Sequence, residues 1–125
     1  MLSSRVLLRS GDPARSQAFY RDVLGLAVYR EFGPQDSPGL VFFLGNGLLE
    51  VSGPGDEPAR GLALWVQVRD VAAEVARLRA AGTTVLRDPR IEPWGLVEAW
   101  VADPEGVRIV LVEVPADHPL RRDQR

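Results

Sequence analysis

The chain has 125 residues, of which 46% are hydrophobic and 26% charged, and its formal net charge is −2. This composition is normal for a folded globular protein and excludes a disordered chain. The small net charge gives no reason to expect a nucleic acid or an anionic membrane as partner. Cysteine is absent, which excludes disulfides, thiolate metal sites and cysteine nucleophiles. Because the sequence shows neither a signal peptide nor a membrane span, we expect a cytoplasmic protein.

The first half of the chain predicts one helix and four strands. The apolar run at 6–8 is the first strand candidate. Asp12 followed by Pro13 is typical of a helix start, apolar residues then recur at helical spacing, and Gly25 suits the C-terminal cap. The remaining strands are expected over 26–32, 39–44 and 48–52, with a tight turn at 45–47.

Residues 53–61 form the clearest linker, and after them the same order begins again. Asp70 is the expected cap of a second helix that ends at Gly82. The strands of this half are expected over 62–68, 83–86, 96–102 and 107–114. A loop should run through Pro89 and residues 93–95, and residues 103–106 have a type I turn signature. Residues 115–125 are polar and rich in arginine, so we expect a frayed tail.

The sequence therefore predicts an α+β fold built from two βαβββ modules. We expect one domain over 1–114, with half-domains at 3–52 and 62–114 joined by the linker, followed by the tail at 115–125. Each half alone would leave one face of its sheet bare. We therefore expect the two sheets to meet and to enclose a shared, sheet-lined cleft.

Two segments resemble signatures of one superfamily. Residues 16–25, Ser-Gln-Ala-Phe-Tyr-Arg-Asp-Val-Leu-Gly, resemble the first-helix signature of the glyoxalase, bleomycin-resistance and extradiol-dioxygenase proteins, the vicinal oxygen chelate superfamily. Residues 93–95, Pro-Trp-Gly, followed by Asp-Pro-Glu-Gly at 103–106, resemble the second-half signature of the same group. The resemblance extends over residues 3 to 114, almost the whole chain.

The resemblance implies four metal-ligand positions, two in each half. In this sequence they hold Arg5 and Glu50 in the first half and Ala63 and Val110 in the second. Arginine stays protonated and has no acceptor, and alanine and valine side chains offer no lone pair. A lone carboxylate gives too few ligands for Zn²⁺, Fe²⁺, Ni²⁺ or Mn²⁺. We therefore expect no metal and no cofactor.

Strand alternation predicts which side chains line the cleft with these four positions. The set mixes aliphatic, aromatic, basic and acidic groups, as a small-molecule pocket does. Glu50 either pairs with Arg5 where the metal would be or is a solvated carboxylate. Arg5 or Arg9 could instead hold a carboxylate or phosphate of a ligand. The ligand-binding candidates are Arg5, Leu7, Arg9, Glu50, Trp65, Gln67, Trp94, Trp100, Arg108 and Val110.

Tryptophans give the cleft flat walls that suit a planar ring system. Trp65 should share the face of Ala63, and Trp94 lies in the loop that edges the cleft in similar proteins. The face of Trp100 stays open, because its register depends on bulges near the turn at 103–106. Phe42 and Phe43 should point to opposite faces, so one of them faces the cleft.

We expect no catalytic residues, because the known nucleophile and phosphate motifs are missing and the carboxylates of Glu50 and Glu98 are better explained as structural. The sequence thus favours a metal-free small-molecule binding protein that sequesters an antibiotic or a planar metabolite. The resemblance to the bleomycin-resistance branch also implies antibiotic resistance and a homodimer. The alternative is a metal-dependent lyase, isomerase or dioxygenase with displaced ligands, and a third is a pocket for regulation or an unknown metabolite.

Overall fold

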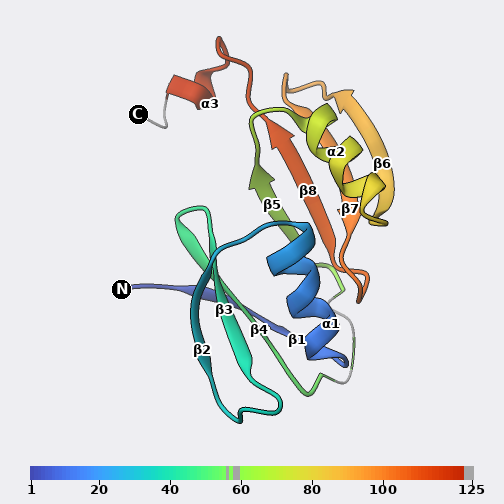
Figure 1. Cartoon of the computed structure of the whole chain (residues 1–125). Coiled ribbons are helices and arrows are strands. Elements are labelled where there is room, and N and C mark those ends of the chain that lie inside the picture. The colour runs from blue at the N-terminus through green and yellow to red at the C-terminus, as the bar shows by residue number, and fades with distance from the viewer. Residues whose placement is uncertain (56, 58–59, 123–125) are drawn as a thin grey trace. The chain divides into compact units, whose positions relative to one another are not determined.

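The structure of the protein is a computed structural model, in which residues 1–55, 57 and 60–122 are described. Its contacts divide the chain into two compact units. The first unit comprises Met1–Gly61 and the turn Asp103–Val107, and the second comprises Leu62–Ala102 and Arg108–Arg125. Each unit holds one four-stranded sheet and the helix that packs on it (Figure 1).

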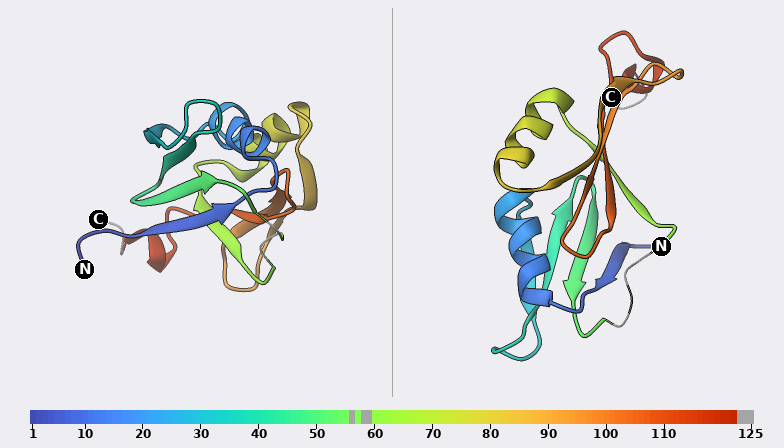
Figure 2. Two further views of the ribbon diagram at one scale, coloured as in Figure 1. Left: turned by 90° about the horizontal axis from the view of Figure 1, so that it is seen from below. Right: turned by 90° about the vertical axis from the view of Figure 1, so that its right-hand side faces the viewer.

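The first sheet has the strand order β1-β4-β3-β2, with β1 parallel to β4 and the other pairs antiparallel. Its elements are β1 (Arg5–Arg9), α1 (Pro13–Ala18), η1 (Phe19–Val23), β2 (Val28–Phe32), β3 (Gly39–Leu44) and β4 (Gly47–Ser52). Figure 2 shows α1 alongside one face of this sheet. The apolar core between them comprises Leu8, Phe19, Tyr20, Leu40, Phe42, Leu49 and Val51.

The first helix begins as the sequence predicts. The Asp12 carboxylate accepts a hydrogen bond from the Arg15 N–H at 3.2 Å, and Pro13 occupies the first helical position. The helix then widens into one π-helical turn, in which the Leu24 N–H bonds the Phe19 carbonyl at 2.8 Å. This wider turn carries Phe19 and Tyr20 into the core.

The second sheet repeats the first with the order β5-β8-β7-β6, and β5 is parallel to β8. Its elements are β5 (Ala63–Gln67), α2 (Val71–Ala80), β6 (Thr84–Ile91), β7 (Val97–Ala102) and β8 (Arg108–Glu113). The core under α2 comprises Leu64, Val71, Val75, Leu78, Ala99, Val101, Ile109 and Leu111. The α+β fold of two βαβββ modules is therefore confirmed, whereas a cleft shared by both sheets stays a prediction.

Two expectations for the second half were wrong. Residues 87–91 form the end of β6 instead of a loop, because β6 is an edge strand and its register shift between Arg87 and Arg90 accommodates Pro89. The tail is not frayed where it is described, since Pro119–Arg122 forms a helical turn, α3. Leu120 packs against the apolar cluster of Leu96, Val112 and Val114, which the sequence pattern gave no reason to expect.

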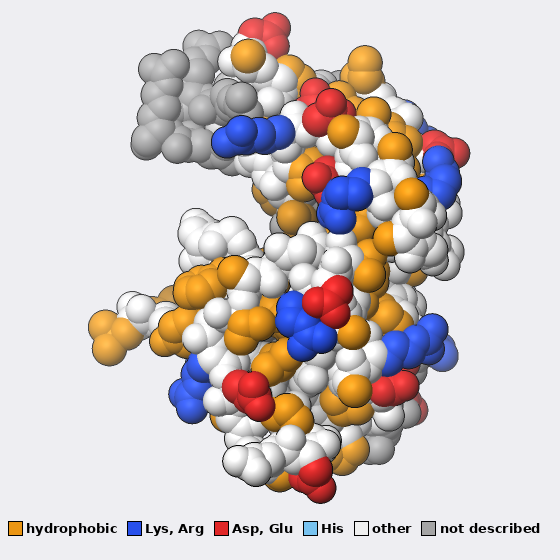
Figure 3. Space-filling model, viewed as in Figure 1, with side chains coloured by type: hydrophobic (Ala, Val, Ile, Leu, Met, Phe, Trp, Pro, Cys, Tyr) orange, Lys and Arg blue, Asp and Glu red, His pale blue; other side chains and the backbone are white. Residues whose placement is uncertain are grey.

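Within the described residues, no helix is long and apolar enough to cross a membrane. The surface seen in Figure 3 interleaves basic and acidic side chains with apolar ones. Such a mixture agrees with the net charge of −2 and lacks the single-sign field that favours nucleic acid.

Candidate functional site

The strand registers decide which side chains share a face. In the first sheet Leu7 is paired with Glu50, and Arg9 with Ser52, so these residues lie on the face opposite α1, here called the Glu50 face. Arg5, two residues from Leu7, lies on the same face. The predicted alternation of side chains in these strands is confirmed, whereas their place in a ligand cleft stays a prediction. Phe43 shares this face and is 45% exposed, whereas Phe42 points to α1 and is fully buried.

An ion-pair cluster lies at the centre of the Glu50 face. The Arg5 Nη1 donates to Glu50 Oε1 at 3.1 Å, and Arg9 Nη1 lies 3.7 Å from Glu50 Oε2. Arg9 also donates to Ser52 Oγ at 2.7 Å, and the Ser52 hydroxyl donates to Glu50 at 3.2 Å. Glu50 is only 7% exposed, so its charge needs these partners. Of the two alternatives that the sequence left open for Glu50, the structure shows the ion pair with Arg5.

The second sheet has the same register as the first. Ala63 pairs with Arg108 as Arg5 pairs with Leu48, and Trp65 pairs with Val110 as Leu7 pairs with Glu50. Ala63 and Val110 therefore stand where Arg5 and Glu50 stand in the first half, as the repeat predicted. The carboxylate of the first half has an apolar counterpart in the second.

The face of Trp100, which the sequence left open, follows from β7. Trp100 is paired directly with Val110, which is itself paired with Trp65. Side chains of directly paired residues project from the same face. Trp65, Val110 and Trp100 therefore form one row across the sheet, on the face opposite α2, here called the Trp100 face. Trp65 is 49% exposed, so part of its ring is accessible on this face.

Two guanidinium groups lie over the Trp100 ring. Arg87 lies 4.0 Å and Arg108 4.6 Å from the ring centroid. Arg87 also pairs with Glu92, which pairs with Arg90 at 3.1 Å. Burial opposes ionisation of Glu92, but hydrogen bonds and charges of Arg90 and Arg87 hold the pKa of its carboxyl below the ordinary value. Glu92 is therefore ionised and neutralises part of the positive charge beside the ring.

The other candidates of the second half lie near this row. Gln67 is paired with Val112, which is paired with Glu98, so all three share the Trp100 face. The Trp94 indole N–H donates to Glu98 Oε2 at 2.7 Å, and this bond explains Glu98 as a structural carboxylate. The Trp94 carbonyl is bonded to His118 at 2.9 Å, which ties the loop to the tail.

The four family positions do not fit a divalent metal. Their side chains supply one carboxylate, Glu50, and it is engaged by two arginines. Arg5 adds a permanent positive charge at the position of a ligand. Across the described ranges, no three His, Cys, Asp or Glu side chains are grouped so that they could hold a metal ion. A metal placed at Glu50 would have to displace Arg5 and Arg9 and would still lack protein ligands.

Comparison with known proteins agrees with this architecture. The family model of the Glyoxalase/Bleomycin resistance protein/Dioxygenase superfamily matches residues 3–111. The chain belongs to this superfamily. This match confirms the resemblance to the superfamily that the two sequence signatures indicated. No curated protein matches the chain.

Several solved structures are similar over most of the chain. A superfamily member from Sphaerobacter thermophilus is 20% identical, with a TM-score of 0.76 over 91% of this chain and 98% of that one. TnmS3, an antibiotic binding protein from Streptomyces sp. CB03234, is 23% identical, with a TM-score of 0.75 over 92% and 97%. A lactoylglutathione lyase from Agrobacterium tumefaciens is 20% identical, with a TM-score of 0.66 over 87% and 90%. At these identities the likeness shows the fold.

The sequence alone did not identify some residues of the Glu50 face and of the Trp100 face. Arg87 was not a candidate, because its strand was expected to end before it and only the pairing with Trp100 brings it to the ring. Ser52 was expected on the face of Glu50 but not as the hydroxyl that links Arg9 to the carboxylate. A short polar side chain two residues after a buried carboxylate in the same strand is the signal that identifies such a link.

Proposed function

We propose that the protein binds a small planar organic molecule with an acidic group, without a metal and without converting it. The ligand ring stacks on the Trp100 face beside Trp65, and its acidic group is held by Arg108. An antibiotic or a planar metabolite is the ligand class, and the antibiotic binding protein TnmS3 supports binding as a use of this fold. As part of the same proposal, the protein is a cytoplasmic homodimer that contributes to antibiotic resistance.

The stack of Arg108 on Trp100 carries this proposal. The Arg108 Cζ lies 4.6 Å from the Trp100 ring centroid, a cation–π distance, and a guanidinium has five N–H donors, more than a contact with the ring needs. Those groups match the oxygens of a carboxylate or phosphate. The exposed Trp65 in the same row supplies a surface for stacking. Apolar and aromatic side chains with a few charged groups among them are typical of sites that bind small molecules.

The test uses 1-naphthoate as an anionic probe and 1-naphthalenemethanol as its neutral counterpart. The chain has three tryptophans, so three indole N–H signals report binding residue by residue in NMR titrations. We expect naphthoate to shift the signals of Trp65 and Trp100. Arg108→Gln should weaken naphthoate binding about tenfold and change binding of the alcohol little, because it removes a charge-assisted bond.

Arg69→Gln is the matched control, since it removes the same charge from an exposed position of the second unit. The proposal is wrong if naphthoate leaves all three indole signals in place, or if both variants weaken it equally. Elemental analysis after incubation with Ni²⁺, Zn²⁺, Mn²⁺ and Fe²⁺ tests the metal-free part. One tightly bound equivalent would favour a metal-dependent lyase, isomerase or dioxygenase. Light scattering tests the homodimer.

A further inference from the structure

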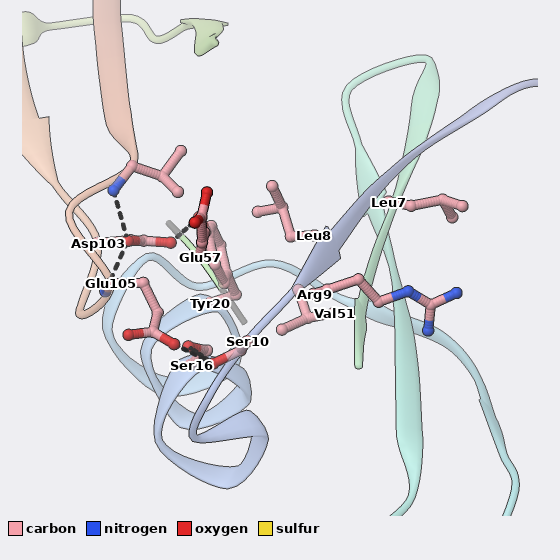
Figure 4. Close-up of a pocket in the computed structure, with 11 residues that line it drawn as sticks. Leu7, Leu8, Arg9, Ser10, Ser16, Tyr20, Val51, Glu57, Asp103 and Glu105 are labelled. Atoms are coloured by element: carbon pink, nitrogen blue, oxygen red, sulfur yellow. Dashed lines mark hydrogen bonds between the residues drawn. The ribbon is translucent and has the colours of Figure 1, made fainter. Parts of the chain in front are cut away.

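The first unit contains a pocket that the proposed function does not use. Its volume is about 220 Å³, and it lies at the end of β1, beside α1, η1 and the turn between β7 and β8. Leu8, Val51 and Val107 give it apolar walls. Its polar lining comes from Ser10, Ser16, Tyr20, Glu57, Asp103 and Glu105, which Figure 4 shows gathered around the turn.

The charged side chains that line this pocket are three carboxyl groups and the guanidinium of Arg9, and Arg15 lies close enough to act on the pKa of Glu105. Glu57, Asp103 and Glu105 contribute three carboxyl groups. Hydrogen bonds from the Gly11 N–H and the Ser10 hydroxyl hold the pKa of Glu105 below its ordinary value, so Glu105 is ionised. Arg9 also lines the pocket, but its guanidinium extends away from Asp103 and Glu105 toward Ser52 and Glu50 (Figure 4).

The hydroxyl hydrogens of the side chains that line the pocket already form hydrogen bonds within the protein. The Tyr20 hydroxyl donates to Asp103 Oδ2 at 2.7 Å, and the Ser10 hydroxyl donates to Glu105 at 3.0 Å. Because Ser10 has one hydrogen, the 2.7 Å bond between Ser10 and Ser16 must take its hydrogen from Ser16. What these side chains can still offer a ligand is oxygen lone pairs. A molecule that binds here must therefore bring donors.

We propose that this pocket binds a small organic ammonium ion. The ammonium N–H groups bond the oxygens of Tyr20, Asp103 and Glu105, and the carbon chain packs against Leu8, Val51 and Val107. The site differs in charge and position from the Trp100 face, so it selects a different class of ligand. The described carboxylates are not grouped as metal ligands, which favours an organic cation with its own apolar part over a metal ion.

The test uses n-butylammonium, with n-butanol and n-butyrate as neutral and anionic counterparts of the same size. Backbone amide signals of Gly11, Glu105 and Val107 report binding in NMR titrations. We expect saturable shifts with butylammonium and a dissociation constant of about 1–10 mM, as suits so small a ligand. Equal shifts with butanol or butyrate would overturn the proposal, and so would the absence of shifts with butylammonium at about 50 mM.

Variants then test which carboxylate supplies the negative charge that binds butylammonium. Glu105→Gln keeps an acceptor for Gly11 and Ser10 but removes the charge, and should weaken butylammonium about tenfold. Glu57→Gln, at an exposed position of the rim, should weaken it about threefold. Glu31→Gln, an exposed residue of β2 in the same unit, is the matched control and should change nothing. Equal affinity in all three variants contradicts the proposal. Arg108→Gln should leave butylammonium binding intact, which separates this test from that of the proposed function.

Discussion

Removing the hydroxyl of Tyr20 is the sharpest test of how the first unit is held together. The hydroxyl donates to Asp103 at 2.7 Å, and both residues are buried. Asp103 also accepts bonds from the backbone N–H groups of Glu105 at 2.9 Å and Val107 at 2.8 Å. The carboxylate thus fixes the turn and ties it to η1, and Tyr20→Phe removes one of its three bonds.

The expected cost follows from the charge and the burial. A hydrogen bond to a charged group contributes about 1.5–3 kcal/mol net, so Tyr20→Phe should lower the free energy of unfolding by about 2 kcal/mol. In a domain of this size the melting temperature should fall by about 6–10 °C. Tyr29→Phe is the control, because Tyr29 is 50% exposed and its variant should stay within about 0.5 kcal/mol of the parent.

The pH dependence makes the test specific to the hydroxyl. Burial, followed by the nearby Asp103 charge, raises the pKa of Tyr20 far above its ordinary value of 10.0. Above about pH 10 the unfolded chain loses this proton and the folded chain keeps it, so the stability of the parent falls by about 1.4 kcal/mol per pH unit. The Tyr20→Phe variant has no hydroxyl at this position, so its stability does not fall in this way as the pH rises. Urea denaturation should therefore show the difference between the two proteins narrowing from about 2 to about 0.6 kcal/mol between about pH 9 and pH 11. A constant difference would refute the reasoning.

Three smaller predictions test other contacts. Gly55→Ala should destabilise the protein by about 1–3 kcal/mol in urea denaturation, because its Cβ would overlap the Arg9 carbonyl oxygen. Gly47→Ala, whose Cβ would make only an ordinary van der Waals contact, should destabilise the protein far less than Gly55→Ala. Glu50→Leu should lower the free energy of unfolding by about 1 kcal/mol, because it leaves two half-exposed guanidinium groups without their carboxylate. If this loss is electrostatic, it should be smaller at high salt. Leu120→Ala should speed amide hydrogen exchange over 115–122, and unchanged exchange would show that its packing does not order the tail.

Much of the fold could be predicted because its signals are local and repeated. Asp12 and Asp70 cap the two helices as expected, with bonds of 3.2 Å and 3.0 Å to backbone N–H groups. The repeat aligned Arg5 with Ala63, and the position after the turn at 103–106 gave Val110 as the counterpart of Glu50; the matching registers confirm both. In a strand without a bulge, such as β1, β4, β5 or β8, side-chain alternation then needs only one correct position to place the others.

What could not be predicted depends on contacts between distant segments. The face of Trp100 depends on how β7 pairs with β8, and the position of Arg87 depends on an edge strand that tolerates Pro89. The bond between Tyr20 and Asp103 joins residues 83 positions apart. Each lies in a segment that the sequence singled out, but periodicity and turn signals do not pair the two segments, so they could not reveal the pocket beside them.

The corresponding positions of the two halves carry different side chains, and this difference is the basis for proposing an anion site in the second half only. In the first half Glu50 is buried, and a carboxylate so placed needs a cation, so Arg5 and Arg9 direct their charge to it. In the second half the corresponding Val110 needs no partner, and Arg108 lies over Trp100 instead. The charge of Arg5 is thus used within the protein, whereas among the described residues the contact given for the Arg108 guanidinium is with the Trp100 ring, and the proposed function assigns its N–H groups to a ligand. Arg108→Gln is therefore the variant that tests recognition of an acidic group, and Arg5→Gln tests mainly the surroundings of Glu50.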